Sequence, residues 1–150
     1  MPYKKTQIGW LIIGIFLPIL FIFYLAYENQ WGSDPIPLDS FKAIVLIFVI
    51  IVALFYKLSI EIDGRVLKLS YGIGLIRIKF KIDQLEEVQV IKTPWYNGLG
   101  IRFTSKGMLY NIHGLKAVRI KYISNGKSKS VMVGTAEPER LKEALEESFL

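Results

Sequence analysis

The chain of 150 residues is long enough for one domain of ordinary size, but 52% of its residues are apolar, more than a simple soluble globule carries. It contains 19 Lys and Arg against 13 Asp and Glu, a formal net charge of +6, and no cysteine. The lack of cysteine excludes disulfides, thiolate metal sites and a cysteine nucleophile.

Two apolar stretches near the N-terminus predict a helical hairpin through a membrane. The first, residues 8–27, has no charged residue, and at about 1.5 Å per residue it covers a hydrocarbon core of roughly 30 Å. It is longer than the apolar core of a signal peptide, and no small-residue cleavage site follows it. The second, residues 41–57, is charge-free from Ala43 to Tyr56. We therefore expect two retained membrane spans joined by a short external loop.

The basic residues around these spans predict their orientation. Lys4 and Lys5 precede the first span and Lys57 ends the second, whereas the connecting residues 28–40 include three acidic residues and no Lys or Arg. By the positive-inside rule, both termini lie in the cytoplasm. The sequence thus predicts a multi-pass protein of the inner (plasma) membrane, with a first unit formed by residues 1–57. The spans have no internal ionisable residue, so nothing in them indicates transport.

From residue 58 the apolar residues alternate with polar ones, which is the period of half-buried strands. Two strands at 58–63 and 66–71 are joined by Asp63-Gly64, a hairpin signal that would place Ile60 opposite Leu67. The next strand alternates without a fault, with Ile76, Ile78, Phe80 and Ile82 facing inward. Further candidate strands are 86–91, 100–104, 108–112, 117–123 and 130–134. We expect about seven of these eight to form.

A single amphipathic helix is predicted at residues 138–149, where apolar residues recur at helical spacing after Pro138. Short antiparallel strands followed by one helix are typical of a small barrel or orthogonal sandwich whose open end the helix closes. The expected fold is therefore a membrane α-helical hairpin followed by a mainly-β barrel, residues 58–150, capped by one C-terminal α-helix.

Part of this second unit resembles a known family. The residues that carry the resemblance are Trp95, Tyr96, Gly98, Gly100, Ile101, Arg102, Gly107, Leu109, Tyr110, Asn111, Gly114, Ala117, Val118, Gly134, Thr135, Pro138 and Leu141. With them the chain resembles small bacterial membrane proteins that have a pleckstrin-homology-like (PH-like) domain, over about half its length. The resemblance implies a PH-like fold, and because that fold hosts unrelated roles it implies no particular activity.

No pattern in the sequence points to catalysis, a metal or a cofactor. Gly98 and Gly100 are followed by a strand pattern instead of a helix, so a turn is expected there and not a phosphate loop. His113 is the single histidine, and it reads as a turn or edge residue without a partner. Glu86 and Glu87 are adjacent on a strand, so they point to opposite faces. The sequence predicts a non-enzymatic protein.

Charge is distributed unevenly along the second unit. Residues 57–135 contain 14 Lys and Arg against 5 Asp and Glu, a net of +9, while residues 136–150 contain 2 against 5, a net of −3. Because anionic lipids attract nearby basic residues, the cations on two neighbouring strands are candidates for headgroup binding: Lys68, Arg77, Lys79 and Lys81. The alternative is that they are ordinary strand-surface charges. Nucleic acid is not an expected partner, because a membrane-tethered chain without a clear pattern of stacking aromatics fits it poorly.

Trp95, Tyr96 and Arg102 are candidates for contact with a protein partner. For the two rings, packing in the core at a sheet corner is the expectation we favour, and the alternative is a loop position in contact with the bilayer interface or a partner protein. The function that we expect is that of a membrane-anchored adaptor or scaffold for a partner protein or for a second copy of the chain. The alternatives are sensing of anionic lipid by the basic strand face, and a role as accessory subunit of a membrane enzyme or transporter.

Overall fold

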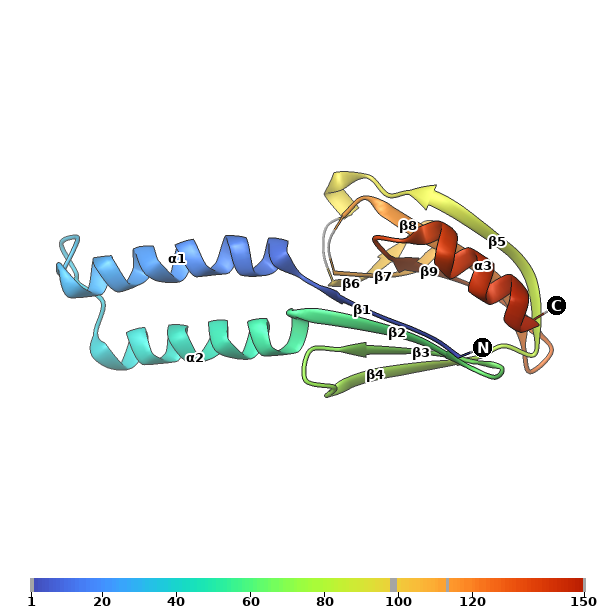
Figure 1. The fold of residues 1–150 in the computed structure, drawn as a ribbon. Helices are drawn as coiled ribbons and strands as arrows, with labels where there is room; N and C mark the ends of the chain where they lie inside the picture. Colours follow the sequence, from blue (N-terminus) through green and yellow to red (C-terminus); the bar gives the residue numbers. More distant parts are fainter. Residues whose placement is uncertain (1, 98–99, 113, 150) are drawn as a thin grey trace.

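The computed structural model describes residues 2–97, 100–112 and 114–149 (Figure 1). Its helices are α1 (Trp10–Glu28), α2 (Leu38–Phe55) and α3 (Pro138–Phe149), with one 3₁₀ turn, η1 (Trp95–Asn97). Nine strands lie within these described residues: β1 (Tyr3–Ile8), β2 (Lys57–Asp63), β3 (Val66–Tyr71), β4 (Ile76–Lys81), β5 (Gln84–Lys92), β6 (Gly100–Thr104), β7 (Gly107–Asn111), β8 (Lys116–Ser124) and β9 (Lys127–Gly134).

The predicted helical hairpin is formed by α1 and α2, which lie side by side and extend away from the rest of the molecule (Figure 1). Both are long and apolar enough to cross a membrane. Among their described residues only Ile12 is buried, so neither helix is the core helix of a globular domain. Aromatic rings join the two: Phe16 and Phe48 meet edge to face at 5.2 Å, and Tyr27 stacks on Phe41 at 4.5 Å.

The N-terminal tail is a strand, which the sequence analysis did not predict. Residues 1–57 were expected to form one unit of tail and spans, but β1 pairs antiparallel with β2, from Tyr3 opposite Ile62 to Ile8 opposite Lys57. The Gly9 N–H then donates to the Tyr56 carbonyl oxygen at 2.7 Å, so the pairing continues to the start of the helices. The hairpin is therefore an insertion between two neighbouring strands of one sheet.

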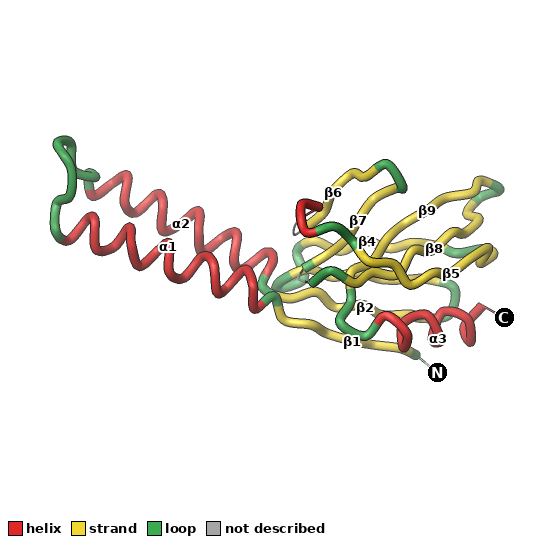
Figure 2. The backbone as a smooth tube through the Cα atoms, turned by 90° about the horizontal axis from the view of Figure 1, so that it is seen from above, coloured by secondary structure: helices red, strands yellow, loops and turns green. Residues whose placement is uncertain are grey.

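Two sheets pack face to face. The first has the order β1-β2-β3-β4, and the second has the order β5-β8-β9-β7-β6, with β7 and β9 parallel. Apolar side chains of both sheets form one core together with Leu141 and Leu145 of α3. α3 contacts β5, β8 and β2, and Figure 2 shows it on the side of β1, with the β6–β7 hairpin on the opposite side. We call the two sheets and α3 the β domain.

This arrangement confirms the predicted layout of apolar helices, strands and a C-terminal helix, and it corrects three details. All eight candidate strands form, and with β1 the described chain has nine instead of about seven. They form two sheets, so the β domain is a sandwich and not one continuous barrel. In the hairpin formed by β2 and β3 the turn is Gly64-Arg65, Asp63 pairs with Val66, and Ile60 lies opposite Leu69. A register shift of two residues keeps every side chain on its predicted face.

An ion pair connects β1 to the segment before α3. Lys5 Nζ lies 2.8 Å from Glu137 Oε1, and Arg140 Nη1 lies 3.5 Å from Glu137 Oε2. The hydrogen bond from Lys5, with the charges of Lys5 and Arg140, holds the pKa of Glu137 below its ordinary value. A carboxyl with a lowered folded-state pKa stabilises the fold above its unfolded pKa, and that contribution disappears as the pH falls through the folded pKa.

We therefore expect the stability difference between the wild type and Glu137→Gln to be largest at neutral pH and to shrink as the pH falls below about 4. The measurement is the melting temperature of both proteins in detergent micelles between neutral and acidic pH. Comparing the two melting temperatures cancels the effect of the carboxyls that both proteins contain. A difference that stays constant over this range would show that the pair contributes nothing through its charge.

Candidate binding surfaces

The acidic residues of the described chain do not assemble into a metal site. No group of three or more His, Asp or Glu side chains among the described residues is placed to hold a metal ion. Glu86 and Glu87 take separate partners, because Ser128 donates to Glu86 at 2.7 Å and Lys121 lies 3.0 Å from Glu87. His113 lies outside the described residues, and so does Gly98. Gly100 begins β6, so the strand predicted after the glycines is confirmed.

Of the four predicted headgroup residues, three lie around one depression on the outer face of the first sheet. Lys68 and Lys79 are directly opposite one another on β3 and β4, and Arg77 is opposite Ser70. The depression measures about 410 Å³, and Lys68, Arg77, Lys79 and Lys4 line it together with Glu61 and the hydroxyls of Ser59 and Ser70. Lys81 lies further along β4 and does not line it.

Three of these cations already have partners in the fold. Lys68 Nζ donates to Asp63 Oδ2 at 2.6 Å, and this hydrogen bond raises the pKa of Lys68. Arg77 Nε donates to the Gly74 carbonyl oxygen at 2.7 Å, and Lys81 Nζ lies 3.8 Å from Asp83. Part of the positive charge that was predicted to bind lipid headgroups is therefore paired within the β domain.

A larger groove, of about 640 Å³, opens between the two sheets on the side opposite α3. Its lining residues come from β4, β6, β7, β8 and β9: Lys79, Phe80, Lys81, Phe103, Gly107, Met108, Tyr110, Tyr122, Ser124, Lys129, Ser130 and Val131. Its floor is aromatic, because Phe80 meets Tyr110 at 5.4 Å and Tyr122 at 6.3 Å, both edge to face. The three lysines supply its charge, and the described lining has no acidic side chain.

Phe103 lies at the lip of this groove with 88% of its surface exposed. The described part of β6 pairs only with β7, and that of β4 only with β3, so each strand has one edge without a neighbouring strand. Figure 2 shows β4 and the β6–β7 hairpin on the same side of the domain. α3 closes the sandwich on one side, while on the other an exposed aromatic ring and two strand edges border the groove.

The sequence does not predict this groove. Phe103 alternates with Ile101 in the strand pattern, which predicts a core position, and Ile101 does pack against the core. Phe103 is exposed, and its strand β6 is the last one of its sheet. Whether a side chain is covered also depends on which strands lie beside its own, and the alternation within one strand does not show this.

Trp95 and Tyr96 are exposed, so the favoured expectation of core packing was wrong. Their exposed fractions are 81% and 68%, and their rings meet edge to face at 6.2 Å in η1. Tyr96 lines a hollow of about 310 Å³ whose lining includes Lys92, Lys106 and Met132. Arg102 is exposed on β6 and is not among the described residues that line this hollow. The three predicted contact residues therefore do not form one site.

No protein-family model, no curated protein and no solved structure matches this chain significantly. The resemblance to PH-like domains therefore stays a prediction.

Proposed function

We propose that the protein is a non-enzymatic adaptor, anchored in the inner membrane by the α1–α2 hairpin, whose PH-like β domain binds a partner protein beside the membrane. The hairpin supports the anchor, because both helices are apolar, long enough to span and exposed. The place of β1 in the sheet supports a retained first span, since cleavage after α1 would remove a strand from the β domain. The lysines before α1 and after α2 support a cytoplasmic β domain.

The observation that carries the proposal is the groove at the open side of the sandwich. Its aromatic floor, its exposed Phe103 and its free strand edges are the features of a surface that accepts an extended peptide segment. Lys79, Lys81 and Lys129 border the groove, so the segment that fits carries apolar side chains together with carboxylates. A subunit of a membrane enzyme or transporter is one such partner, and a second copy of the chain is another.

The direction of β4 favours a partner over lipid as the target of its lysines. The first sheet runs away from the hairpin in roughly the same direction as the helices (Figure 1). Arg77 lies at the end of β4 close to the hairpin, and at about 3.3 Å per residue Lys81 lies roughly 13 Å further from the membrane. The basic strand face thus faces sideways, and one cation of the four is close to the headgroups.

Photo-crosslinking from the groove tests this function. With benzoylphenylalanine in place of Phe103, the full chain in its native membranes should form one or a few adducts of defined mass. Phe103 is exposed, so the replacement leaves the fold intact. Adding Lys79→Glu should lower the adduct yield roughly fivefold, because it places a like charge against the carboxylates of the partner. Mass spectrometry of the adducts identifies the partner protein or a second copy of this chain.

Two controls make the result specific. Benzoylphenylalanine at Arg65, in the exposed turn between β2 and β3, should not give the same adducts. Lys127→Glu reverses an exposed charge outside the groove lining and should leave the yield from position 103 unchanged. Adducts with lipid alone, or a yield that responds equally to both charge reversals, would contradict the adaptor function.

A further inference from the structure

Exposed apolar side chains surround the point where the hairpin leaves the β domain. They come from two segments far apart in the sequence: the β3–β4 turn supplies Ile73 and Leu75, and η1 supplies Trp95 and Tyr96. We call these four residues the apolar rim. None of them lines the groove between the two sheets, which we call the partner groove.

The β3–β4 turn is held against the end of α2. The Gly72 N–H donates to the Lys57 carbonyl oxygen at 2.8 Å, and the Ile73 N–H donates to the Ala53 carbonyl oxygen at 3.3 Å. Gly72 has a φ of +58° and lies so close to the helix that a Cβ there would overlap the Ala53 carbonyl. The turn is thereby fixed beside the last residues of the second span, yet Ile73 and Leu75 are 62% and 71% exposed.

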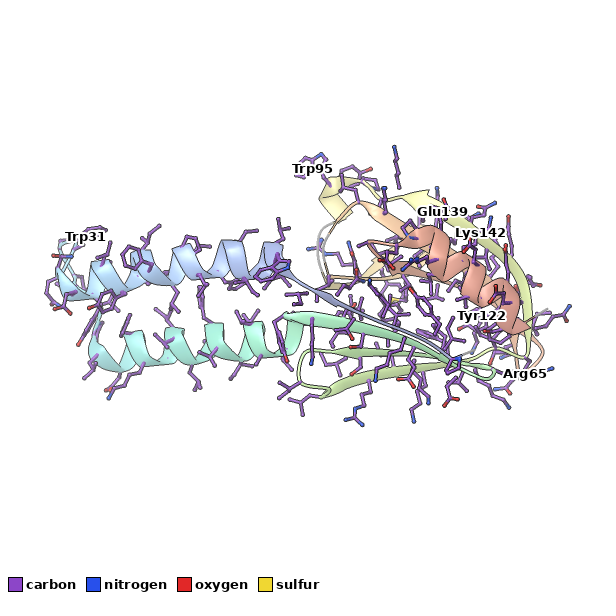
Figure 3. The ribbon with its side chains drawn as sticks, in the orientation of Figure 1. Trp31, Arg65, Trp95, Tyr122, Glu139 and Lys142 are labelled. Atoms are coloured by element: carbon purple, nitrogen blue, oxygen red, sulfur yellow. The ribbon has the colours of Figure 1, made fainter. Side chains whose placement is uncertain are left out.

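η1 lies at the same end of the β domain, on the other side of the hairpin. Figure 3 shows Trp95 close to the level at which the helices begin, and Arg65 at the far end. The Thr93 N–H donates to the Leu115 carbonyl oxygen at 2.7 Å, which holds the segment before η1 against the start of β8. The rings of Trp95 and Tyr96 project from this segment into solvent.

Cations accompany the apolar rim. Lys57 begins β2 directly after α2, and its Nζ lies 5.3 Å from the centroid of the Tyr56 ring. Lys92 and Lys116 are directly opposite one another at the ends of β5 and β8 next to η1. Arg77 bonds to the β3–β4 turn itself. Tryptophan, tyrosine and apolar tips beside lysine and arginine are the composition of a surface at the membrane–water interface.

We infer that the apolar rim lies in the headgroup region of the leaflet from which the hairpin emerges, so that the β domain has two further contacts with the lipid surface besides its spans. The inference rests on the proposed membrane anchor and is independent of the partner groove. Contacts on both sides of the hairpin fix the tilt of the β domain. The groove then opens parallel to the membrane, toward proteins embedded in or lying on the same leaflet.

Tryptophan quenching by lipid tests the inference. The full chain with Trp10→Phe and Trp31→Phe keeps Trp95 as its single tryptophan. It is reconstituted into vesicles of phosphatidylcholine and phosphatidylglycerol, either plain or brominated near the top of the acyl chains. We expect brominated lipid to roughly halve the emission of Trp95, because an interfacial indole lies within contact of those carbons. Circular dichroism confirms that the variant is folded.

Two single-tryptophan variants separate the possible outcomes. Trp10 alone, at the start of α1, reports the anchor and should be quenched, while Arg65→Trp alone, at the far end of the β domain, should not. Quenching of Trp10 without quenching of Trp95 would overturn the inference and leave the anchor in place. Quenching of neither would overturn both, and equal quenching at positions 95 and 65 would show that the β domain lies on the bilayer without the inferred orientation.

Discussion

Gly72→Ala is expected to destabilise the β domain far more than Gly64→Ala, although both glycines have a φ of +58°. The left-handed backbone costs an L-residue about 1–2 kcal/mol at either position. At Gly64 the new Cβ meets nothing within 4 Å, so this cost is the whole effect. At Gly72 it would lie 2.5 Å from the Leu54 carbonyl oxygen and closer still to that of Ala53.

Helix backbone cannot give way as a flexible side chain can, so the β3–β4 turn has to move away from α2. That movement breaks the hydrogen bonds from the amides of Gly72 and Ile73 to Lys57 and Ala53. Adding their loss to the strain, we expect Gly72→Ala to cost about 3–5 kcal/mol in unfolding free energy.

Thermal unfolding of both variants in detergent micelles, followed by circular dichroism, measures the difference. The variants share the mutation type, the φ value and a position in a hairpin of the same sheet, so what distinguishes them is the contact with α2. Equal losses for the two would mean that the turn does not rest on the helix, and the first of the two contacts inferred for the apolar rim would lose its support.

Periodicity explains what the sequence could predict. Charge-free runs predict the apolar parts of α1 and α2, and strict alternation predicts β4, whose Ile76 and Ile78 pack on the core while Arg77 and Lys79 are exposed. Each of these features depends only on the residues of one segment and on which of its faces is exposed. The faces of β2 and β3 were correct for the same reason, even though their register was two residues off.

Pairing between distant segments explains what the sequence could not predict. β1 has no apolar alternation, because its inward positions include Lys5 and Gln7, which take polar partners at the end of β9 and in the segment that follows it. The groove lined by Phe80 and Phe103 lies where β4 and β6 are the last strands of their sheets. The exposure of Trp95 likewise depends on where η1 lies relative to the hairpin. In each case the deciding neighbour is many residues away in the chain.

Gln7→Leu is expected to cost about 2–4 kcal/mol, although it replaces a polar side chain by an apolar one in a buried place. Gln7 is 6% exposed, and its amide joins the two sheets. Its Nε2 donates to the Gly134 carbonyl oxygen at 2.7 Å, and its Oε1 accepts from the Ala136 N–H at 3.1 Å. Leucine has a similar volume but leaves both backbone groups without these bonds, at about 1–3 kcal/mol each.

The matched control is Thr6→Val, the neighbouring position on β1 whose side chain points to the outer face. Thr6 shares a hydrogen bond of 2.9 Å with Ser59, and both hydroxyls are near solvent, so its loss should change stability by no more than about 0.5 kcal/mol. Hydrogen exchange resolves the effect by segment: in Gln7→Leu the amides of β1 should exchange faster while those of β8 and β9 change less. Because β1 leads directly into α1, loosening it would free the start of the hairpin from the β domain. Unchanged protection of β1 would mean that pairing with β2 alone holds this strand and that the Gln7 bridge adds nothing.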